Sequence, residues 1–97
     1  MNLQFKFSSK LWQVSSKGGW FFVSLPIEIS DEIRTNFKKF EEGWGRLKAK
    51  AEVENEQWET AIWYDSKIST YLLPIKLEIR KKYNLVSEQI IQIIIYV

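Results

Sequence analysis

The chain has 97 residues, of which 45% are hydrophobic and 15% aromatic, and its formal net charge is +2. This length and composition exclude a disordered chain and suit one hydrophobic core, so we expect a single domain over residues 1–97. Because the sequence has no Cys and no His, it excludes disulfides, thiol nucleophiles, Ser-His relays and zinc sites built on these ligands.

The beginning of the chain alternates apolar and polar residues, as a half-buried strand does. Residues 3–7 show strict alternation, and the strand signal resumes over 11–14 after two serines. A small, flexible turn over 15–19 precedes a stretch over 20–25 whose aromatic residues leave little polar surface on either face. This pattern predicts strands on both sides of the turn, the second of them central in its sheet.

The first predicted helix begins at Ser30, whose hydroxyl suits the N-cap position. Ile33, Phe37 and Phe40 follow at helical spacing and form one apolar stripe. The Gly-Trp-Gly segment over 43–45 cannot continue a stable helix. We therefore expect the helix to end before these glycines and to pack through its apolar stripe.

The remaining predicted elements are four strands and a second helix. The cleanest alternation covers 46–54, and a tight reversal leads into a strand over 57–64. A strand over 69–73 precedes the second helix, from about residue 76 to residue 83, in which apolar residues recur every four positions. The last strand covers 89–97.

This last strand has two apolar faces, which is unusual for a strand beside water. Its members are Ile91, Ile93, Ile95 and Val97 on one face, and Ile90, Ile94 and Tyr96 on the other. A free edge of this composition is an aggregation hazard, so we expect the strand to be paired and interior. We also expect one of the two helices to cover the second face, and the barrel to close within a monomer.

A short motif occurs twice at corresponding places. Leu25-Pro26-Ile27 precedes the first helix and Leu73-Pro74-Ile75 precedes the second, each after an aromatic strand. An internal pseudo-duplication explains this recurrence, and so does chance, because the motif is short and Pro often ends a strand. The residues alone leave both interpretations open.

Four blocks, taken in order, carry a resemblance to a known family. They are GWFFVSLP over 19–26, GWGRLKAKA over 43–51, WETAI over 58–62 and YLLPIK over 71–76. Together they resemble the small bacterial β-barrel domain of unknown function DUF1905, whose fold is similar to the double-split barrels of the AbrB and MazE swapped-hairpin proteins. The resemblance implies a mainly β fold, a six-stranded small barrel, closed or half-open, with two short helices, and it brings no established activity. Where the family usually has a Gly-Asp turn before the last strand, this chain has Ser87-Glu88.

An enzyme would have to work with carboxylates, lysines, tyrosines and hydroxyls. The acidic residues at 41–42 and over 52–59 are the best candidates for acid-base chemistry or for a metal site. Alternate carboxylates on a strand face are ordinarily solvated, and their spacing is not that of a calcium loop. We therefore predict no enzymatic activity, no metal and no cofactor.

A nucleic-acid interface is the alternative function that the sequence supports. Arg46, Lys48 and Lys50 are predicted to line one strand face about 6.6 to 6.8 Å apart, which is close to the spacing of phosphates. Glu52 and Glu54 continue the same row with the opposite charge. This mixed face and the small net charge make nucleic-acid binding the second choice.

A non-enzymatic binding or interaction module is the leading prediction. Five Trp residues exceed what a small core needs. Trp63 has the opposite strand parity to Trp58, and Trp44 lies between two glycines, so we expect one or both to be partly exposed at an aromatic-rich pocket or surface. Coverage of these Trp residues by the helices is the alternative that the residues leave open. Lys76 and Arg80 are the candidate cations for an acidic ligand, and the partner is either a small molecule or another protein. No leader or membrane-spanning run is recognisable, so we expect a cytoplasmic protein.

Overall fold

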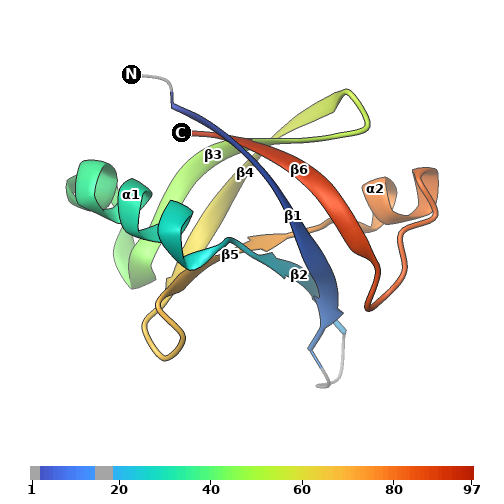
Figure 1. Cartoon of the computed structure of the whole chain (residues 1–97), viewed down its shortest axis with the longest axis horizontal. Coiled ribbons are helices and arrows are strands. Elements are labelled where there is room, and N and C mark those ends of the chain that lie inside the picture. The colour runs from blue at the N-terminus through green and yellow to red at the C-terminus, as the bar shows by residue number, and fades with distance from the viewer. Residues whose placement is uncertain (1–2, 15–18) are drawn as a thin grey trace.

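The computed structural model describes residues 3–14 and 19–97, so the turn predicted over 15–19 lies, except for Gly19, outside the described residues. The described residues form a closed six-stranded antiparallel barrel with the strand order β1-β2-β5-β4-β3-β6 (Figure 1). Its strands are β1 (Gln4–Gln13), β2 (Phe21–Ser24), β3 (Arg46–Val53), β4 (Glu56–Asp65), β5 (Thr70–Pro74) and β6 (Ile90–Tyr96). The mainly β, six-stranded barrel is confirmed, and the closed form is the correct one.

Strand β1 runs without a break through the two serines that interrupt its apolar pattern. It pairs with β6 from Gln4 to Lys10 and then with β2 through Leu11 to Gln13. The hydroxyl of Ser9 donates a hydrogen bond to the carbonyl of Ser24, 2.7 Å away. A polar residue is therefore accommodated where β1 changes from one neighbouring strand to the other, and the two predicted segments are one strand.

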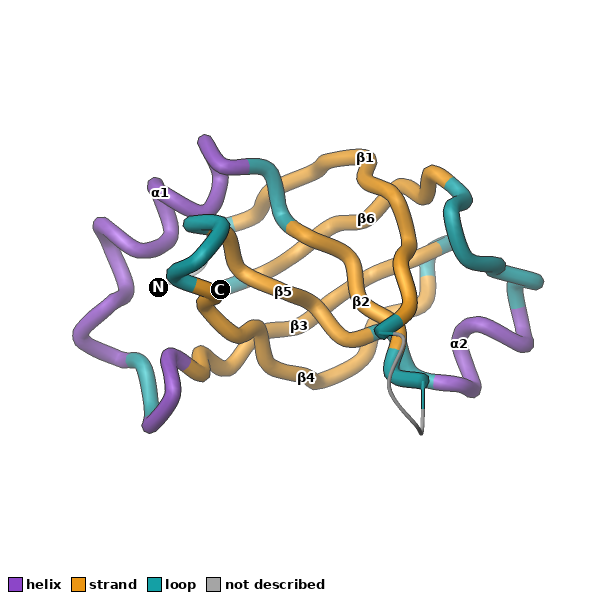
Figure 2. The backbone as a smooth tube through the Cα atoms, turned by 90° about the horizontal axis from the view of Figure 1, so that it is seen from below, coloured by secondary structure: helices purple, strands orange, loops and turns teal. Residues whose placement is uncertain are grey.

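The two helices cover opposite ends of the barrel, not the outer face of β6. Helix α1 (Ile27–Phe37) lies at one end and α2 (Leu77–Lys82) at the other (Figures 1 and 2). The prediction that a helix covers the second face of β6 is wrong, because Ile90 on that face is 61% exposed and Ile94 is only half-buried. A short Leu-Pro-Ile segment connects each helix to the end of the preceding strand. Each helix therefore lies over the barrel opening at which that strand ends.

Helix α1 begins earlier than predicted, and Ser30 is not its N-cap. Pro26 occupies the N-cap position, and its carbonyl accepts the first helical hydrogen bond from the Ser30 N–H at 2.9 Å. Ser30 therefore lies inside the helix, where it is fully buried. After Phe37 the chain continues as two 3-10 turns, η1 (Lys38–Phe40) and η2 (Gly43–Gly45). Phe40 is 59% exposed and is therefore not part of the buried stripe.

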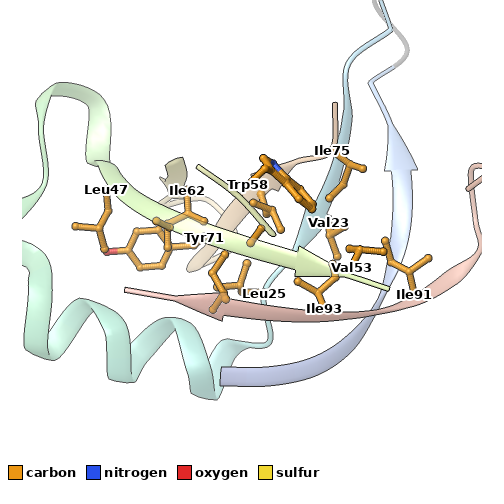
Figure 3. Packing of buried hydrophobic residues seen from close by; sticks show 14 of the residues in the cluster. Val23, Leu25, Leu47, Val53, Trp58, Ile62, Tyr71, Ile75, Ile91 and Ile93 are labelled. Atoms are coloured by element: carbon orange, nitrogen blue, oxygen red, sulfur yellow. The ribbon is translucent and has the colours of Figure 1, made fainter. Parts of the chain in front are cut away.

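The core fills the barrel interior between the two helices. At the α1 end, Tyr71 packs near Leu47 and Ile62, whereas Trp58 and Ile75 lie toward the α2 end (Figure 3). The inward row of β6 is fully buried, as the alternation predicted. On its outward row, Ile94 is directly opposite Lys6 of β1 and Glu52 of β3. The alternation in the sequence therefore distinguishes the inward face of β6 from its outward face.

The strand order has the symmetry that an internal repeat would produce. Exchanging β1 with β4, β2 with β5 and β3 with β6 leaves the cyclic order unchanged. The two Leu-Pro-Ile segments then correspond, and β2 pairs directly with β5 through Val23 and Leu73. This symmetry agrees with a pseudo-duplicated barrel.

Candidate functional site

A pocket of about 380 Å³ lies beside α2, at the end of the barrel opposite α1. It is formed where the start of β2, the first half of β4 and the end of β5 meet the helix. Its lining residues are Gly19, Trp20, Phe21, Trp58, Glu59, Thr60, Pro74, Ile75, Lys76, Leu77 and Arg80. The pocket therefore combines three aromatic side chains with two cations.

The aromatic side chains of the pocket differ in burial. Trp58 comes from β4, is 9% exposed and belongs to the hydrophobic core, so it forms a fixed wall. Figure 3 shows its indole close to Ile75, the residue that leads into α2. Trp20 is 65% exposed, although it contacts Phe22 with a centroid separation of 6.2 Å. An exposed indole beside a buried one gives the pocket an aromatic mouth and an aromatic interior.

Both cations of the pocket are held against aromatic rings. The guanidinium carbon of Arg80 lies 3.8 Å from the ring centroid of Phe21, and its Nε donates a hydrogen bond to the Ile75 carbonyl at 3.1 Å. The Lys76 ammonium lies 6.0 Å from the Trp58 ring centroid. No ion pair within the described part of the chain involves either cation. Glu59, at the rim, has an 85% exposed side chain and pairs with Lys50 instead.

Helix α2 is held on the barrel by contacts on both sides. The Ile75 N–H donates to the Phe21 carbonyl at 2.9 Å, and Ile79 is 1% exposed. On the other side, the Glu56 carboxylate accepts hydrogen bonds from the Lys82 ammonium at 2.6 Å and the Tyr83 hydroxyl at 2.8 Å. These two donors lower the pKa of the Glu56 carboxyl. The wall that carries both pocket cations is therefore anchored to β2 and β4.

The opposite end of the barrel holds a polar cluster supplied by the chain itself. The guanidinium carbon of Arg34 lies 3.6 Å from the Tyr64 ring centroid. A terminal nitrogen of the same guanidinium lies 3.5 Å from the Glu41 carboxylate. The Tyr71 hydroxyl donates a hydrogen bond to the same carboxylate. Burial and the adjacent Glu41 raise the pKa of the Tyr71 hydroxyl far above its usual value, because both disfavour the phenolate. Sequence periodicity gave no signal for this cluster, since Glu41 follows the end of the helix.

Comparison with known proteins identifies the family of the chain. The profile of one family, Domain of unknown function (DUF1905), matches residues 7–95. The chain belongs to this family. No protein of curated description matches the chain. The similarity to the AbrB and MazE barrels stays a prediction.

The turn before β6 contains Ser87 and Glu88, where the resemblance led us to expect a Gly-Asp turn. Glu88 has a φ of 76°, in the left-handed region that glycine adopts most readily. Its N–H donates to the Leu11 carbonyl at 2.7 Å, which ties the turn to β1. The turn is therefore held by backbone pairing without a glycine.

The predicted ligand-binding residues of this DUF1905 chain fall in two places. Lys76 and Arg80 come together in the pocket, whereas Trp44 and Trp63 do not line it. Trp44 is 92% exposed in η2 with a φ of 68°, and Trp63 lies across from Arg46 in the β3–β4 pair. The expected exposure of both Trp residues is confirmed. Sequence reasoning missed the role of Trp20 and Trp58, which become neighbours only because β2 and β4 both flank β5.

The predicted basic row forms one outward face of β3, as its alternation indicated. Arg46 forms an ion pair with Glu42, and the Lys50 ammonium lies 3.7 Å from the Glu59 carboxylate. Lys48 is exposed. Two of these three cations thus have a carboxylate partner within the chain, which reduces the charge available to a phosphate backbone.

None of the helices within residues 3–14 and 19–97 is long and apolar enough to cross a lipid bilayer.

Proposed function

We propose that this DUF1905 chain is a non-enzymatic binding module that takes a small, flat, largely apolar ligand in the pocket beside α2. The observation that carries the proposal is that the exposed indole of Trp20 and the buried indole of Trp58 both line a cavity of about 380 Å³. Cavities of about 300–1,000 Å³ with aromatic linings are typical ligand sites.

Stacking on these rings is the expected source of affinity. Each aromatic pair contributes about 0.5–1.5 kcal/mol beyond the burial of its area. The walls need little rearrangement, because Trp58 belongs to the core and α2 is tied to β2 through the hydrogen bond from Ile75 to Phe21. A preformed site loses less conformational entropy on binding.

The experiment is an NMR titration of the labelled protein with 2-naphthamide, a flat and uncharged probe. We expect saturable shifts in the amides of residues 19–21, 58–60 and 75–80, which surround the pocket. Shifts spread evenly over the barrel, or none at millimolar probe, would contradict the proposal.

A matched pair of tryptophan variants distinguishes binding in the pocket from nonspecific binding to exposed aromatic side chains. Trp20→Ala removes the mouth of the pocket and is expected to weaken binding about tenfold. Trp44→Ala removes a more exposed indole that does not line the pocket, so it leaves the affinity unchanged. Equal losses in both variants would contradict a specific site.

A further inference from the structure

We infer that the ligand of this pocket carries a carboxylate group, bound jointly by Lys76 and Arg80. This inference rests on the proposed function and adds the chemical class of the ligand. It follows from the two cations of the pocket, from the absence of an ion-pair partner for either among the described residues, and from a comparison of the two ends of the barrel.

Arg80 has hydrogen-bond donors that no described residue uses. Its Nε is already used by the Ile75 carbonyl, which fixes the plane of the guanidinium against the Phe21 ring. The terminal nitrogens form the part of the group that remains for a ligand. A guanidinium fixed in this way loses little freedom when it binds a planar anion.

The α1 end of the barrel holds an arginine in a similar setting. There Arg34 lies 3.6 Å above the Tyr64 ring, much as Arg80 lies 3.8 Å above the Phe21 ring. Each arginine directly follows a buried isoleucine of its helix. At the α1 end the arrangement is completed by the Glu41 carboxylate, whose side chain is only 9% exposed. At the α2 end the Glu56 carboxylate is already bound by Lys82 and Tyr83. No described carboxylate forms an ion pair with Arg80, so an external carboxylate would complete the same arrangement there.

The charges around the pocket favour an anionic ligand. Lys76 adds a second cation near the Trp58 ring, whereas Glu59 places a carboxylate at the rim. Because Glu59 is paired with Lys50, the two pocket cations remain uncompensated among the described residues, and the choice of a carboxylate over a phosphate follows from the comparison with Glu41 at the α1 end. The ligand that fits is an aromatic or otherwise flat carboxylic acid.

The experiment compares two probes of the same shape by calorimetry at 0.15 M salt. 2-Naphthoate carries the carboxylate, and 2-naphthamide replaces it by an uncharged amide. We expect naphthoate to bind about ten times more tightly or better, since charge-assisted hydrogen bonds exceed neutral ones in strength. In Lys76→Gln this ratio falls toward one. Lys81→Gln, an exposed lysine of the same helix outside the pocket, keeps the ratio of the unmodified protein.

The outcomes separate the inference from the proposed function. Equal affinity for the two probes would overturn the carboxylate assignment and leave the pocket standing as a binding site. Tighter binding of 2-naphthyl phosphate than of 2-naphthoate would also overturn it. If neither naphthoate nor naphthamide binds, the proposed function itself fails. Because Lys76 is exposed, Lys76→Gln is expected to stay folded, and circular dichroism checks this directly.

Discussion

The backbone N–H of Tyr71 in β5 donates a hydrogen bond to the hydroxyl oxygen of Ser30 in α1, 3.0 Å away. Both residues are fully buried, and they are separated by 41 positions in the sequence. On the same side of β5, the Tyr71 carbonyl accepts a hydrogen bond from the Leu25 N–H. Because the chain leaves the sheet at Pro26, the Ser30 hydroxyl supplies the acceptor for Tyr71 and joins the helix to the barrel.

Replacing Ser30 by Ala is expected to destabilise the fold by about 1–3 kcal/mol, since it leaves a buried N–H without an acceptor. Urea unfolding followed by circular dichroism measures this change. Thr35→Ala, on the exposed side of the same helix, is the control and should change stability by less than about 0.5 kcal/mol. A loss at Ser30 no larger than that of the control would contradict the role of this hydrogen bond.

The two arginine–glutamate ion pairs of the described residues should contribute differently to stability, because one is largely buried and the other is exposed. Arg34→Met leaves the Glu41 carboxylate buried without its cation, and we expect a loss of about 3 kcal/mol or more. Arg46→Met breaks the exposed pair with Glu42 and should cost less than about 1 kcal/mol. Both are measured by the midpoint of urea unfolding. Similar costs for the two variants would show that Glu41 is better hydrated than its burial indicates.

Alkaline pH is expected to destabilise the protein through Tyr71. Burial and the Glu41 carboxylate raise the pKa of its hydroxyl in the folded state, whereas in the unfolded chain it titrates near pH 10. Above that pH the unfolded state binds fewer protons than the folded state, so stability falls as pH rises. Unfolding midpoints between about pH 8.5 and pH 11 measure the slope. Tyr71→Phe should have a shallower slope, and an unchanged slope would contradict this assignment.

The sequence predicted the strands well, but it did not predict where the helices pack on the barrel. Alternation depends on local geometry, so the inward row of β6 and the outward row of β3 were correctly assigned. The position of a helix depends on where the barrel opens after closure, which no local pattern encodes. Ser30 illustrates this limit. Its hydroxyl suits an N-cap by residue type, but in the structure it accepts a hydrogen bond from the backbone of β5.

The candidate site was half predictable for the same reason. Lys76 is the N-cap residue of α2 and Arg80 lies one turn into the helix, so their proximity could be predicted from spacing. Trp20 and Trp58 meet only through the pairing of β2 and β4 with β5, which requires the strand order. The exposure of Trp44 was predicted from its flanking glycines, yet exposure alone does not place a residue at a pocket.

Binding of single-stranded nucleic acid to the β3 face is expected to be weak. Glu42 and Glu59 already pair with Arg46 and Lys50, so few counterions would be released from a phosphate backbone. Fluorescence anisotropy with a labelled oligonucleotide at about 20 mM and 150 mM salt tests this. Saturable binding that falls steeply with salt, and that disappears when Arg46, Lys48 and Lys50 are all changed to Gln, would favour the nucleic-acid function instead.

Two neighbouring isoleucines of β6 give the last prediction. Ile93 is 1% exposed and points into the barrel, so Ile93→Lys buries an unpaired charge and should cost more than about 3 kcal/mol. Ile94 is half-buried on the outer face, where its partners across the sheet are Lys6 and Glu52. A lysine at 94 keeps its stem on the sheet and its ammonium near Glu52, so Ile94→Lys should cost about 1 kcal/mol or less.

The same variant tests how the chain assembles. Both edges of β6 are paired within one chain, and the barrel closes on itself, so we expect a monomer that needs no partner strand. Light scattering on a sizing column should give the mass of one chain for the unmodified protein and for Ile94→Lys alike. A stable dimer at micromolar concentration that Ile94→Lys separates into folded monomers would mean that the outer face of β6 is an interface. The half-buried isoleucine would then be covered by a second copy, and the closed barrel would be the subunit of a larger assembly.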